Sequence, residues 1–592
     1  MGRAATGSRG AAVRRLFPAN RARMGREVIL LLFMLLALGL PHFLALDRYV
    51  TVDETKWLMR SGGFYTALAH LDFIRTFQRE HPGVTVTWAG TAGYLWRFPG
   101  YFKIAPEPTP GVTLFHHLLQ DYQKQPLDLL VAGRVFVVTA NVTSVALAFL
   151  VMVRLVGALA AFFAFMLVAF DPYLVGLTRL LHPDSLLSTF TFLSLISFLG
   201  YLTLGRQKGY LLLSGIAAGL AWLTKSPAFF LAPFFGLMLQ VEKLKEGYRE
   251  SLTYNFTIRN LWRTYSPLLL WFAIATAVFV LLWPAMWVDP LGSLKRVFSL
   301  ASTYASEGHD LRVFFNGNLY ESGQSAWYFY PLSYLWRTTP VTLIGLGLAL
   351  LAALMPGRLS ISPLRLKLVL SLLLFAALFT FLISLAEKKF DRYQLPAFIP
   401  LDLVAALGWL SLVEMLQIRT RRPLLAAGLA GAIVLAQVIG VFQTAPYYLD
   451  YYNPMLGGGR KAPQVMMIGW GEGLDQAARY LNNLPEKGRA VAWYGDGCFS
   501  YFYNGTTIPL DQNFSLSDLR KNDYVVIYRD QWQRQLPNPE FLAFFERFDP
   551  IYVVKLGAIE YVRLYSMRQA PVSSSDPARG FFPHDEVLYA SQ

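Results

Sequence analysis

Two adjacent carboxylates, Asp53 and Glu54, directly follow the first long apolar run of the chain, residues 28–46. They therefore stand where a membrane helix leaves the bilayer. The free-energy cost of a charged side chain at this depth is small if the charge reaches water. A charged side chain that lies in a cavity instead is usually functional. A carboxylate so placed has the chemistry to accept the proton of a hydroxyl group. We interpret the pair as a candidate catalytic site at the membrane surface; the alternative is a solvated helix cap.

Basic residues form a second candidate group. Lys388, Lys389 and Arg392 lie in one short segment, followed by Tyr393, between two apolar runs, and Lys225 stands alone in an apolar context. The distribution of charge along the chain, given below, puts both places outside the cytoplasm, where the positive-inside rule disfavours cations. A phosphate at the membrane surface requires such cations. The alternative is a snorkelling loop in which acids of the same segment pair with the cations.

An acid and a histidine in other outer segments complete the set. Asp184 belongs to the sequence His182-Pro183-Asp184, and His81 precedes Pro82. Each also has a purely structural interpretation. An acid in the first turn of a helix is favoured by the helix dipole, which would explain Asp184, and His81 would be an ordinary interfacial residue.

The sequence lacks other common catalytic groupings. It contains no nucleophile–base pair, no phosphate-binding P-loop and no HExxH metal motif. The single cysteine, Cys498, excludes an internal disulfide framework and a cysteine-based metal cluster. Carboxylates with cations suit a one-step transfer from a phosphate-linked donor, because a carboxylate takes the proton of the attacking hydroxyl and cations stabilise the leaving phosphate. No cofactor is certain, and a divalent cation is possible because the spacing of the carboxylates and His81 is not diagnostic.

Composition and charge indicate how these residues are positioned. The chain has 592 residues, of which 54% are hydrophobic and 15% charged, whereas soluble proteins carry about a quarter charged residues. Apolar runs near 20 residues recur, which is the length that crosses about 30 Å of hydrocarbon. The net charge of +15 resides mainly in short loops, as expected for a multi-pass membrane protein. We therefore expect no nucleic-acid partner.

The predicted topology has about eleven membrane spans, with the N-terminus in the cytoplasm and the C-terminus outside. Residues 1–26 carry seven arginines and no acid, which marks them as cytoplasmic. Residues 27–445 form the membrane domain, with a long outer loop at 47–125 in which we expect interfacial short helices anchored by Trp57, Trp88 and Trp96. The predicted spans are 28–46, 130–153, 156–172, 185–204, 209–223, 227–240, 265–287, 332–355, 366–385, 394–416 and 423–443.

The chain becomes polar after the last predicted span. Residues 446–568 combine a probable helix at 474–484 with apolar or alternating runs, which indicates a small α/β domain outside the membrane. The glycines of Gly471-Glu472-Gly473 lack the strand–GxGxxG–helix context of a dinucleotide-binding fingerprint. The tail 569–592 begins rich in Ser, Pro and Ala and is expected to be loose. The predicted strands are 490–495, 523–528 and 551–556.

The motifs resemble those of the GT-C polyprenyl-phosphate-sugar glycosyltransferases, in particular the protein O-mannosyltransferase and aminoarabinose (lipid A) transferase group. The resemblance covers roughly residues 25–440. It departs from the family where Gly83-Val84 follows His81-Pro82 and no lysine closes that element, and the C-terminal domain does not resemble the family's MIR domain. The motifs that carry it are Asp53-Glu54, His81-Pro82, Asp184, Gly219-Leu-Ala-Trp-Leu-Thr-Lys225-Ser-Pro227 and Lys388-Lys-Phe-Asp-Arg-Tyr393-Gln-Leu-Pro396.

The resemblance implies a GT-C fold and an inverting transfer of a sugar, outside the cytoplasm, from a dolichyl- or undecaprenyl-phosphate donor. The acceptor would be a hydroxyl of a protein, lipid or glycan, and the location the cell membrane. Asp53 would be the catalytic base, supported by Glu54 and Asp184. The residues implied in substrate binding are His81, Lys225, Lys388, Lys389, Arg392 and Tyr393.

Two other functions remain open on the sequence alone. A transporter or flippase of a lipid-linked saccharide would show internal repeats and charges near mid-membrane, whereas no convincing repeat is visible and the charges gather at one face. A non-catalytic assembly or sensor protein would act mainly through residues 446–592.

Overall fold

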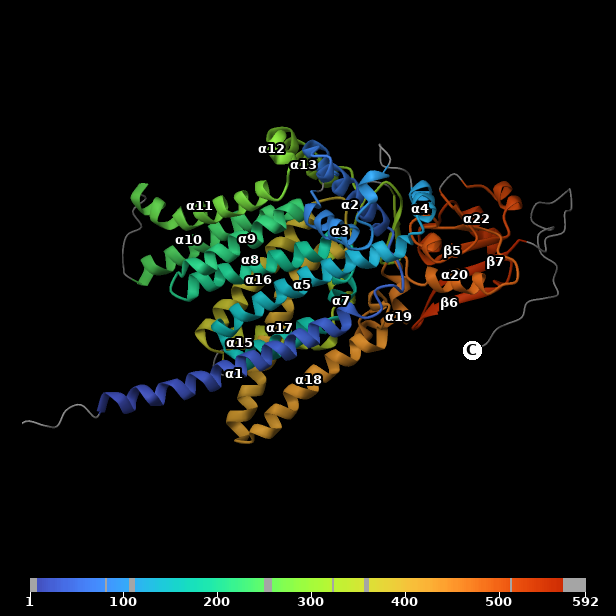
Figure 1. Ribbon diagram of the computed structural model, residues 1–592. Coiled ribbons are helices and arrows are strands. Elements are labelled where there is room, and N and C mark those ends of the chain that lie inside the picture. The colour runs from blue at the N-terminus through green and yellow to red at the C-terminus, as the bar shows by residue number, and fades with distance from the viewer. Residues whose placement is uncertain are drawn as a thin grey trace, which may run out of the picture.

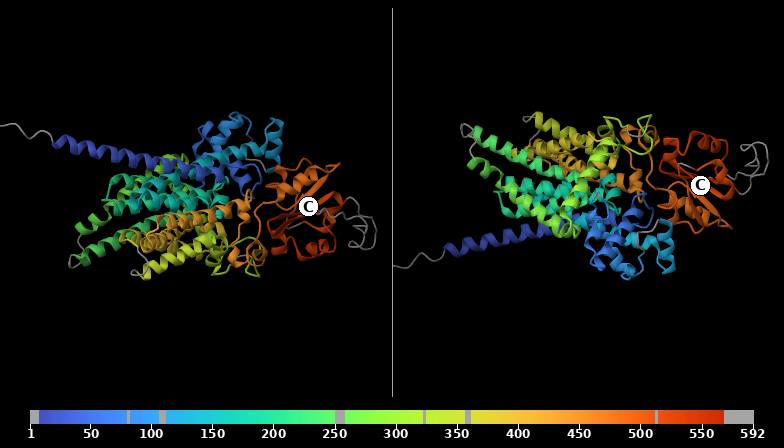
Figure 2. Two further views of the ribbon diagram at one scale, coloured as in Figure 1. Left: turned by 90° about the horizontal axis from the view of Figure 1, so that it is seen from below. Right: turned by 90° about the horizontal axis from the view of Figure 1, so that it is seen from above.

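The computed structural model describes residues 8–79, 82–105, 112–249, 258–321, 324–355, 361–511 and 514–567. Long helices form an elongated bundle, and a small α/β domain caps the end of the bundle opposite to the start of α1 (Figure 1). Views from above and below show the same arrangement (Figure 2). The predicted fold class, an α-helical multi-pass membrane protein with a C-terminal α/β domain, is confirmed.

Eight described helices are long and apolar enough to cross a membrane. They comprise part of α1, with residues Met24–Phe43, and seven later elements. The helices concerned are α1 (Ser8–Phe43), α5 (Pro126–Val156), α8 (Pro183–Thr203), α10 (Leu231–Arg249), α11 (Ile258–Leu281), α16 (Pro363–Ser384), α17 (Leu395–Thr420) and α18 (Pro423–Thr444).

Two further spans are bent pairs of helices, which raises the number to ten. Helices α6 (Ala158–Ala169) and α7 (Pro172–Thr178) meet at 71°, and α14 (Phe329–Arg337) and α15 (Pro340–Leu354) meet at 116°. Both bends fall where the second helix begins at a proline, which has no N–H to continue the preceding helix.

The remaining predicted span, 209–223, is the helix α9 (Lys208–Thr224). Its 17 residues are at the short limit for crossing the hydrocarbon. All eleven predicted spans thus coincide with helices, although the length criterion alone accepts eight to ten of them.

Glycines allow α15 and α17 to approach closely. A Cβ atom added at Gly408 would lie 2.1 Å from the carbonyl oxygen of Gly345, and one added at Gly345 would lie 2.6 Å from that of Ala405. Small residues at such crossings let backbones touch and maximise dispersion contacts between membrane helices.

The outer segment 47–125 forms short helices, as predicted. Trp88 and Trp96 are 38% and 52% exposed, but Trp57 is only 3% exposed. The expectation that Trp57 anchors the interface is therefore wrong; its ring packs edge-on against His182, with centroids 6.5 Å apart. The helices of this segment are α2 (Glu54–Ala69), η1 (Phe73–Thr76), α3 (Val84–Arg97), η2 (Tyr101–Lys103) and α4 (Val112–Asp121).

The C-terminal domain is built on a five-stranded sheet of order β4-β3-β5-β7-β6. Strand β3 runs parallel to β4 and β5, whereas β7 runs antiparallel to β5 and β6. The strands are β3 (Arg489–Ala492), β4 (Thr506–Pro509), β5 (Tyr524–Tyr528), β6 (Tyr552–Leu556) and β7 (Ile559–Ser566), and the helices of the domain include α20 (Leu474–Asn482), α21 (Arg529–Arg534) and α22 (Pro539–Phe545).

The three predicted strands correspond to β3, β5 and β6, and two strands were missed. Strand β4 is a short, polar edge strand, and β7 interrupts its apolar residues with Glu560 and Arg563. Neither has the apolar run that identifies a buried strand.

A buried arginine holds the connection between the bundle and the C-terminal domain. Arg337, at the end of α14, donates hydrogen bonds to the carbonyl oxygens of Leu449 (2.7 Å) and Tyr451 (3.3 Å). The backbone N–H of Asn453 donates to the carbonyl oxygen of Trp336 at 2.8 Å. The connection is thereby fixed beside the segment that carries Arg392.

We predict that Gly345→Ala destabilises the membrane domain because the new methyl group meets the backbone of α17. Overpacking of this kind costs about 1–3 kcal/mol. Thermal unfolding of the detergent-solubilised protein measures the effect as a lower melting temperature. Gly347→Ala on the same helix is the control, since nothing lies within 4 Å of its added Cβ atom. Equal melting temperatures for the two variants would contradict the close packing.

Candidate active site

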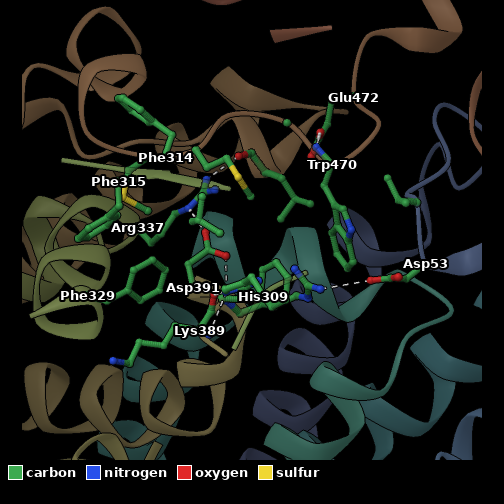
Figure 3. A pocket seen from close by; sticks show the side chains of 18 of the residues that line it. Asp53, His309, Phe314, Phe315, Phe329, Arg337, Lys389, Asp391, Trp470 and Glu472 are labelled. Carbon is green, nitrogen blue, oxygen red and sulfur yellow. Dashed lines mark hydrogen bonds and ion pairs between the residues drawn. The ribbon is translucent and has the colours of Figure 1, made fainter. Parts of the chain in front are cut away.

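Asp53 stands at the N-terminal boundary of α2, but its side chain makes no capping hydrogen bond. Its Oδ2 atom lies 3.2 Å from Nη2 of Arg392 and 3.7 Å from Nε2 of His182. The side chain is 28% exposed and points toward a cavity (Figure 3). Asp53 is thus partly accessible, whereas its charged neighbours are buried.

Asp184, in the first turn of α8, is the second carboxylate at this place and is 1% exposed. Its Oδ1 atom lies 2.9 Å from Nζ of Lys225, and its Oδ2 atom lies 3.3 Å from Nε of Arg392. His182 Nδ1 lies 3.4 Å from Asp184 Oδ2. Arg392 therefore bridges Asp53 and Asp184, with His182 beside both.

Aromatic rings enclose the two cations. The guanidinium carbon of Arg392 lies 4.0 Å from the ring centroid of Phe390 and 4.2 Å from that of Trp470. The ammonium of Lys225 lies 3.7 Å from the ring centroid of Tyr393. Cation–π contacts are strongest where water is excluded. The rings therefore stabilise the buried positive charges, which purely aliphatic surroundings would destabilise.

Glu54 is fully buried and accepts hydrogen bonds on both oxygens. The guanidinium of Arg134 on α5 donates to both oxygens, with a 2.7 Å distance from Nε to Oε1. The backbone N–H and the hydroxyl of Thr51 donate to Oε2 at 3.0 Å each, and the N–H of Leu181 donates to Oε1 at 2.8 Å. Glu54 thus ties the start of α2 to α5 and to the loop that carries Asp184.

The structure separates the two adjacent lysines of the outer loop. Nζ of Lys389 donates to the hydroxyl of Ser325 at 3.0 Å and to the carbonyl oxygen of Ala326 at 3.3 Å, and the side chain lines the cavity. Lys388 lies 3.9 Å from Asp310, and neither Lys388 nor Lys225 is among the residues that line this cavity. His81 lies outside the described residues.

The cavity has a volume of about 200 Å³ and lies between the membrane domain and the C-terminal domain. The membrane domain contributes Asp53, Lys389 and Arg392 to its wall, and the C-terminal domain contributes Trp470 and Glu472. Figure 3 shows Asp53 and Trp470 on one side, whereas the ammonium of Lys389 points away from Asp53. Carboxylates, cations and an aromatic face therefore meet at one space.

The charge state of Asp53 follows from these neighbours. Burial raises the pKa of its carboxyl group, but the contact with His182 and the charge of Arg392 lower it more, and together they hold the pKa below its usual range. Asp53 is therefore ionised at neutral pH and has an oxygen available as a proton acceptor.

The carboxylates of the site pair with cations rather than with one another. Among the residues that the structure describes, no group of three or more His, Cys, Asp or Glu side chains is arranged to hold a metal ion.

Sequence reasoning overlooked three residues that shape the site. Arg134 stands within an apolar run, and a lone arginine at membrane depth is itself a signal of function. His182 was noted only as the start of a helix, although it lies between two carboxylates. Trp470 had no signal, because its contact with Arg392 depends on how the C-terminal domain docks.

The chain is a multi-pass membrane protein. Its candidate acid–base and anion-binding site lies at the end of the helical bundle, beside the C-terminal domain. Residues 128–271 match the family model described as dolichyl-phosphate-mannose-protein mannosyltransferase. This segment contains His182, Asp184 and Lys225, so the match confirms the predicted resemblance over that part of the chain. No curated protein matches the chain.

Several solved structures are similar to this chain. ArnT from Cupriavidus metallidurans bound to undecaprenyl phosphate is 13% identical, with a TM-score of 0.45 over 91% of this chain and 97% of that one. The archaeal oligosaccharyltransferase AglB from Archaeoglobus fulgidus, in complex with an inhibitory peptide and a dolichol-phosphate, is 13% identical, with a TM-score of 0.43 over 88% and 72%. The protein O-mannosyltransferase Pmt1-Pmt2 complex of S. cerevisiae bound to the sugar donor is 18% identical, with a TM-score of 0.31 over 45% and 34%.

We predict that Glu54→Gln destabilises the protein because it leaves the charge of Arg134 buried without a counter-charge. Breaking a buried ion pair by removing one partner costs about 3–5 kcal/mol. The melting temperature and the yield of folded protein measure the effect. Glu414→Gln is the control because Glu414 pairs with Arg365 at 2.6 Å but is 38% exposed, where a pair contributes about 0–1 kcal/mol. Wild-type stability of Glu54→Gln would show that the buried pair is dispensable.

Proposed function

We propose that the chain is an integral-membrane, inverting glycosyltransferase that moves a sugar from a polyprenyl-phosphate donor to an acceptor hydroxyl. The observation that carries the proposal is the position of Arg392, which lies within 3.3 Å of both Asp53 and Asp184 beside a cavity at the end of the membrane helices. One partly accessible carboxylate next to buried cations suits proton removal coupled to the departure of a phosphate.

Asp53 is proposed as the catalytic base. The acceptor oxygen attacks the anomeric carbon of the donor sugar while its proton passes to the carboxylate of Asp53. The bond between the anomeric carbon and the phosphate oxygen breaks, and its electron pair leaves with the polyprenyl phosphate. The reaction inverts the anomeric centre in one step and forms no covalent enzyme intermediate.

Arg392, Lys225 and Lys389 are proposed to bind the donor phosphate. In the structure described here, Arg392 is shared with Asp53. A phosphate that enters the cavity competes for the same guanidinium and favours bidentate contact with it. As the phosphate shares the guanidinium of Arg392, the positive charge that lowers the pKa of Asp53 is partly neutralised, so the carboxylate becomes a better base. Donor binding would thus prepare the base for its reaction.

The other candidate residues have supporting roles in this proposal. Asp184 holds Lys225 and Arg392, and Tyr393 lies under the ammonium of Lys225. Glu54 positions the backbone beside Asp53 through the contacts described above. Lys388 and His81 remain proposed contributors to substrate binding.

The orientation is proposed from charge. The arginine-rich N-terminus would lie in the cytoplasm, and the site and the C-terminal domain outside the cell membrane. The donor would therefore be a sugar linked to dolichyl or undecaprenyl phosphate with its head group on the outer side. The acceptor would be a hydroxyl of a protein, a lipid or a glycan that reaches the same cavity.

We expect Asp53→Asn to lower the rate of sugar transfer by about 10²–10⁴-fold, the usual contribution of a general base. Asn keeps the shape of the side chain but cannot accept the proton. Mass spectrometry of the products after incubation with polyprenyl-phosphate sugars and membrane extract measures the transfer. Asp72→Asn is the control, since Asp72 is an outer-segment acid that pairs with Arg75 at 3.2 Å and is 37% exposed. Full activity of folded, membrane-inserted Asp53→Asn would refute the proposed base.

Removal of the bridging guanidinium should weaken donor binding. We expect Arg392→Gln to raise the Kd for undecaprenyl phosphate at least about tenfold, because a charge-assisted hydrogen bond contributes about 1.5–3 kcal/mol. Titration of the purified protein measures the Kd. Arg296→Gln is the matched control, because Arg296 also pairs with an aspartate, Asp289 at 3.2 Å, and also lies over an aromatic ring, Phe77 at 4.2 Å. Equal affinities for the two variants would count against a phosphate site at Arg392.

A further inference from the structure

A glycine-rich loop of the C-terminal domain reaches the candidate active site. We call residues Gly469–Gly473 the Trp470 loop. Its three glycines have φ values of +96°, +126° and +83°, a region that side chains other than hydrogen disfavour. A Cβ atom at Gly471 would lie 2.2 Å from the carbonyl oxygen of Val50. The loop can therefore approach the segment before Asp53 only with glycine at this position.

The C-terminal domain itself fixes the shape of the Trp470 loop. The carboxylate of Glu472 accepts the backbone N–H of Trp470 at 2.6 Å. The hydroxyl of Tyr528, at the end of β5, donates to the carbonyl oxygen of Glu472 at 3.0 Å and accepts the N–H of Gly471 at 3.0 Å. These internal bonds present the indole of Trp470 to the cavity on a rigid support.

The loop contacts the proposed phosphate arginine directly. The ring of Trp470 lies 4.2 Å from the Arg392 guanidinium, and the ring of Phe390 lies 4.0 Å from it. The same indole lies edge-on to the imidazole of His182, with centroids 5.0 Å apart. Figure 3 shows Trp470 extending from the loop toward the level of Asp53. One side chain of the C-terminal domain thus touches two neighbours of the proposed base.

The C-terminal domain also holds the backbone on both sides of Asp53. The N–H of Val52 donates to the carbonyl oxygen of Trp470 at 3.2 Å. The hydroxyl of Thr55 donates to the carbonyl oxygen of Gly497 at 2.9 Å and lies 2.9 Å from the hydroxyl of Tyr501. Two separate loops of the domain therefore contact the turn that carries Asp53.

We propose that Trp470 is a positioning residue for Arg392, and that the C-terminal domain thereby completes the donor-phosphate site. The inference rests on the proposed function. The rings of Trp470 and Phe390 restrict the movement of the guanidinium group of Arg392. They thereby keep its N–H groups directed at Asp53 and Asp184. Without the indole, Arg392 would lose its fixed direction at the wall of the cavity of about 200 Å³. Pre-organised cations bind an anion more tightly because less freedom is lost on binding.

The test uses the full-length, folded protein and variants that leave the backbone contacts of the loop intact. We expect Trp470→Ala and Trp470→Leu to raise the Kd for undecaprenyl phosphate, and the donor KM, about tenfold, which lies between the contributions of an exposed and a fully desolvated cation–π contact. Trp470→Leu fills most of the space without an aromatic face, so it separates packing from positioning. Trp470→Phe restores an aromatic face and should return both constants close to wild type.

Trp532→Ala is the matched control in the same domain. The guanidinium of Arg563 lies over the Trp532 ring at 4.9 Å, and Trp532 does not line the cavity. We expect this variant to lose stability without a change in Kd. An unchanged Kd in folded Trp470→Leu would overturn the inference. An equal loss of affinity in Trp532→Ala would also overturn it, because the effect would then be a general loss of domain structure.

The Asp53→Asn variant separates failure of this inference from failure of the proposed function. If Asp53→Asn is inactive while Trp470→Leu binds and transfers like wild type, only the positioning role is refuted. If the wild-type protein does not bind undecaprenyl phosphate, the proposed function and the inference are both refuted.

Discussion

The buried ion pair between Glu54 and Arg134 is the constraint on which the outer part of the site depends. Arg134 also donates to the carbonyl oxygens of Leu46 and Tyr49, and Glu54 accepts the N–H of Leu181. One pair therefore connects the exit of α1, the start of α2, the helix α5 and the loop before α8. An ion pair in such a place is costly to assemble and costly to break, so it fixes which loops lie together more than it adds to stability.

Charge sharing explains how carboxylates and cations coexist in a buried site. Arg392 serves two carboxylates, and Asp184 serves two cations. Arg392 and Asp184 each have more than one charged partner, so an incoming anion can take up part of one interaction without leaving a buried charge unpaired. A one-to-one pair would have to break before a ligand could bind. The buried charge left without a partner would then oppose binding. The arrangement thus favours exchange of partners over permanent pairing.

Much of the membrane domain could be predicted from the sequence, because an apolar run and the charges at its ends are visible without coordinates. Asp53, Asp184, Lys225 and Arg392 were all found in this way, and the structure brings them together. The role of Glu54 was less visible, since nothing in the sequence pairs it with Arg134 on another helix. Trp470 could not be found, because its contact depends on the docking of a separate domain. Strand β7 was missed because its charged residues interrupt the apolar pattern.

The position of the Trp470 loop late in the chain has a consequence for biosynthesis. Domains form from the N-terminus onward during synthesis. All of the cations and carboxylates proposed for the chemistry precede the last membrane helix, α18, whereas Gly469–Gly473 follows it. A nascent chain that has inserted every span still lacks the indole that covers Arg392 and the carbonyl that binds Val52. The site therefore reaches its final geometry only after the C-terminal domain has folded against the membrane domain, so a truncated product would be inserted but incompletely assembled.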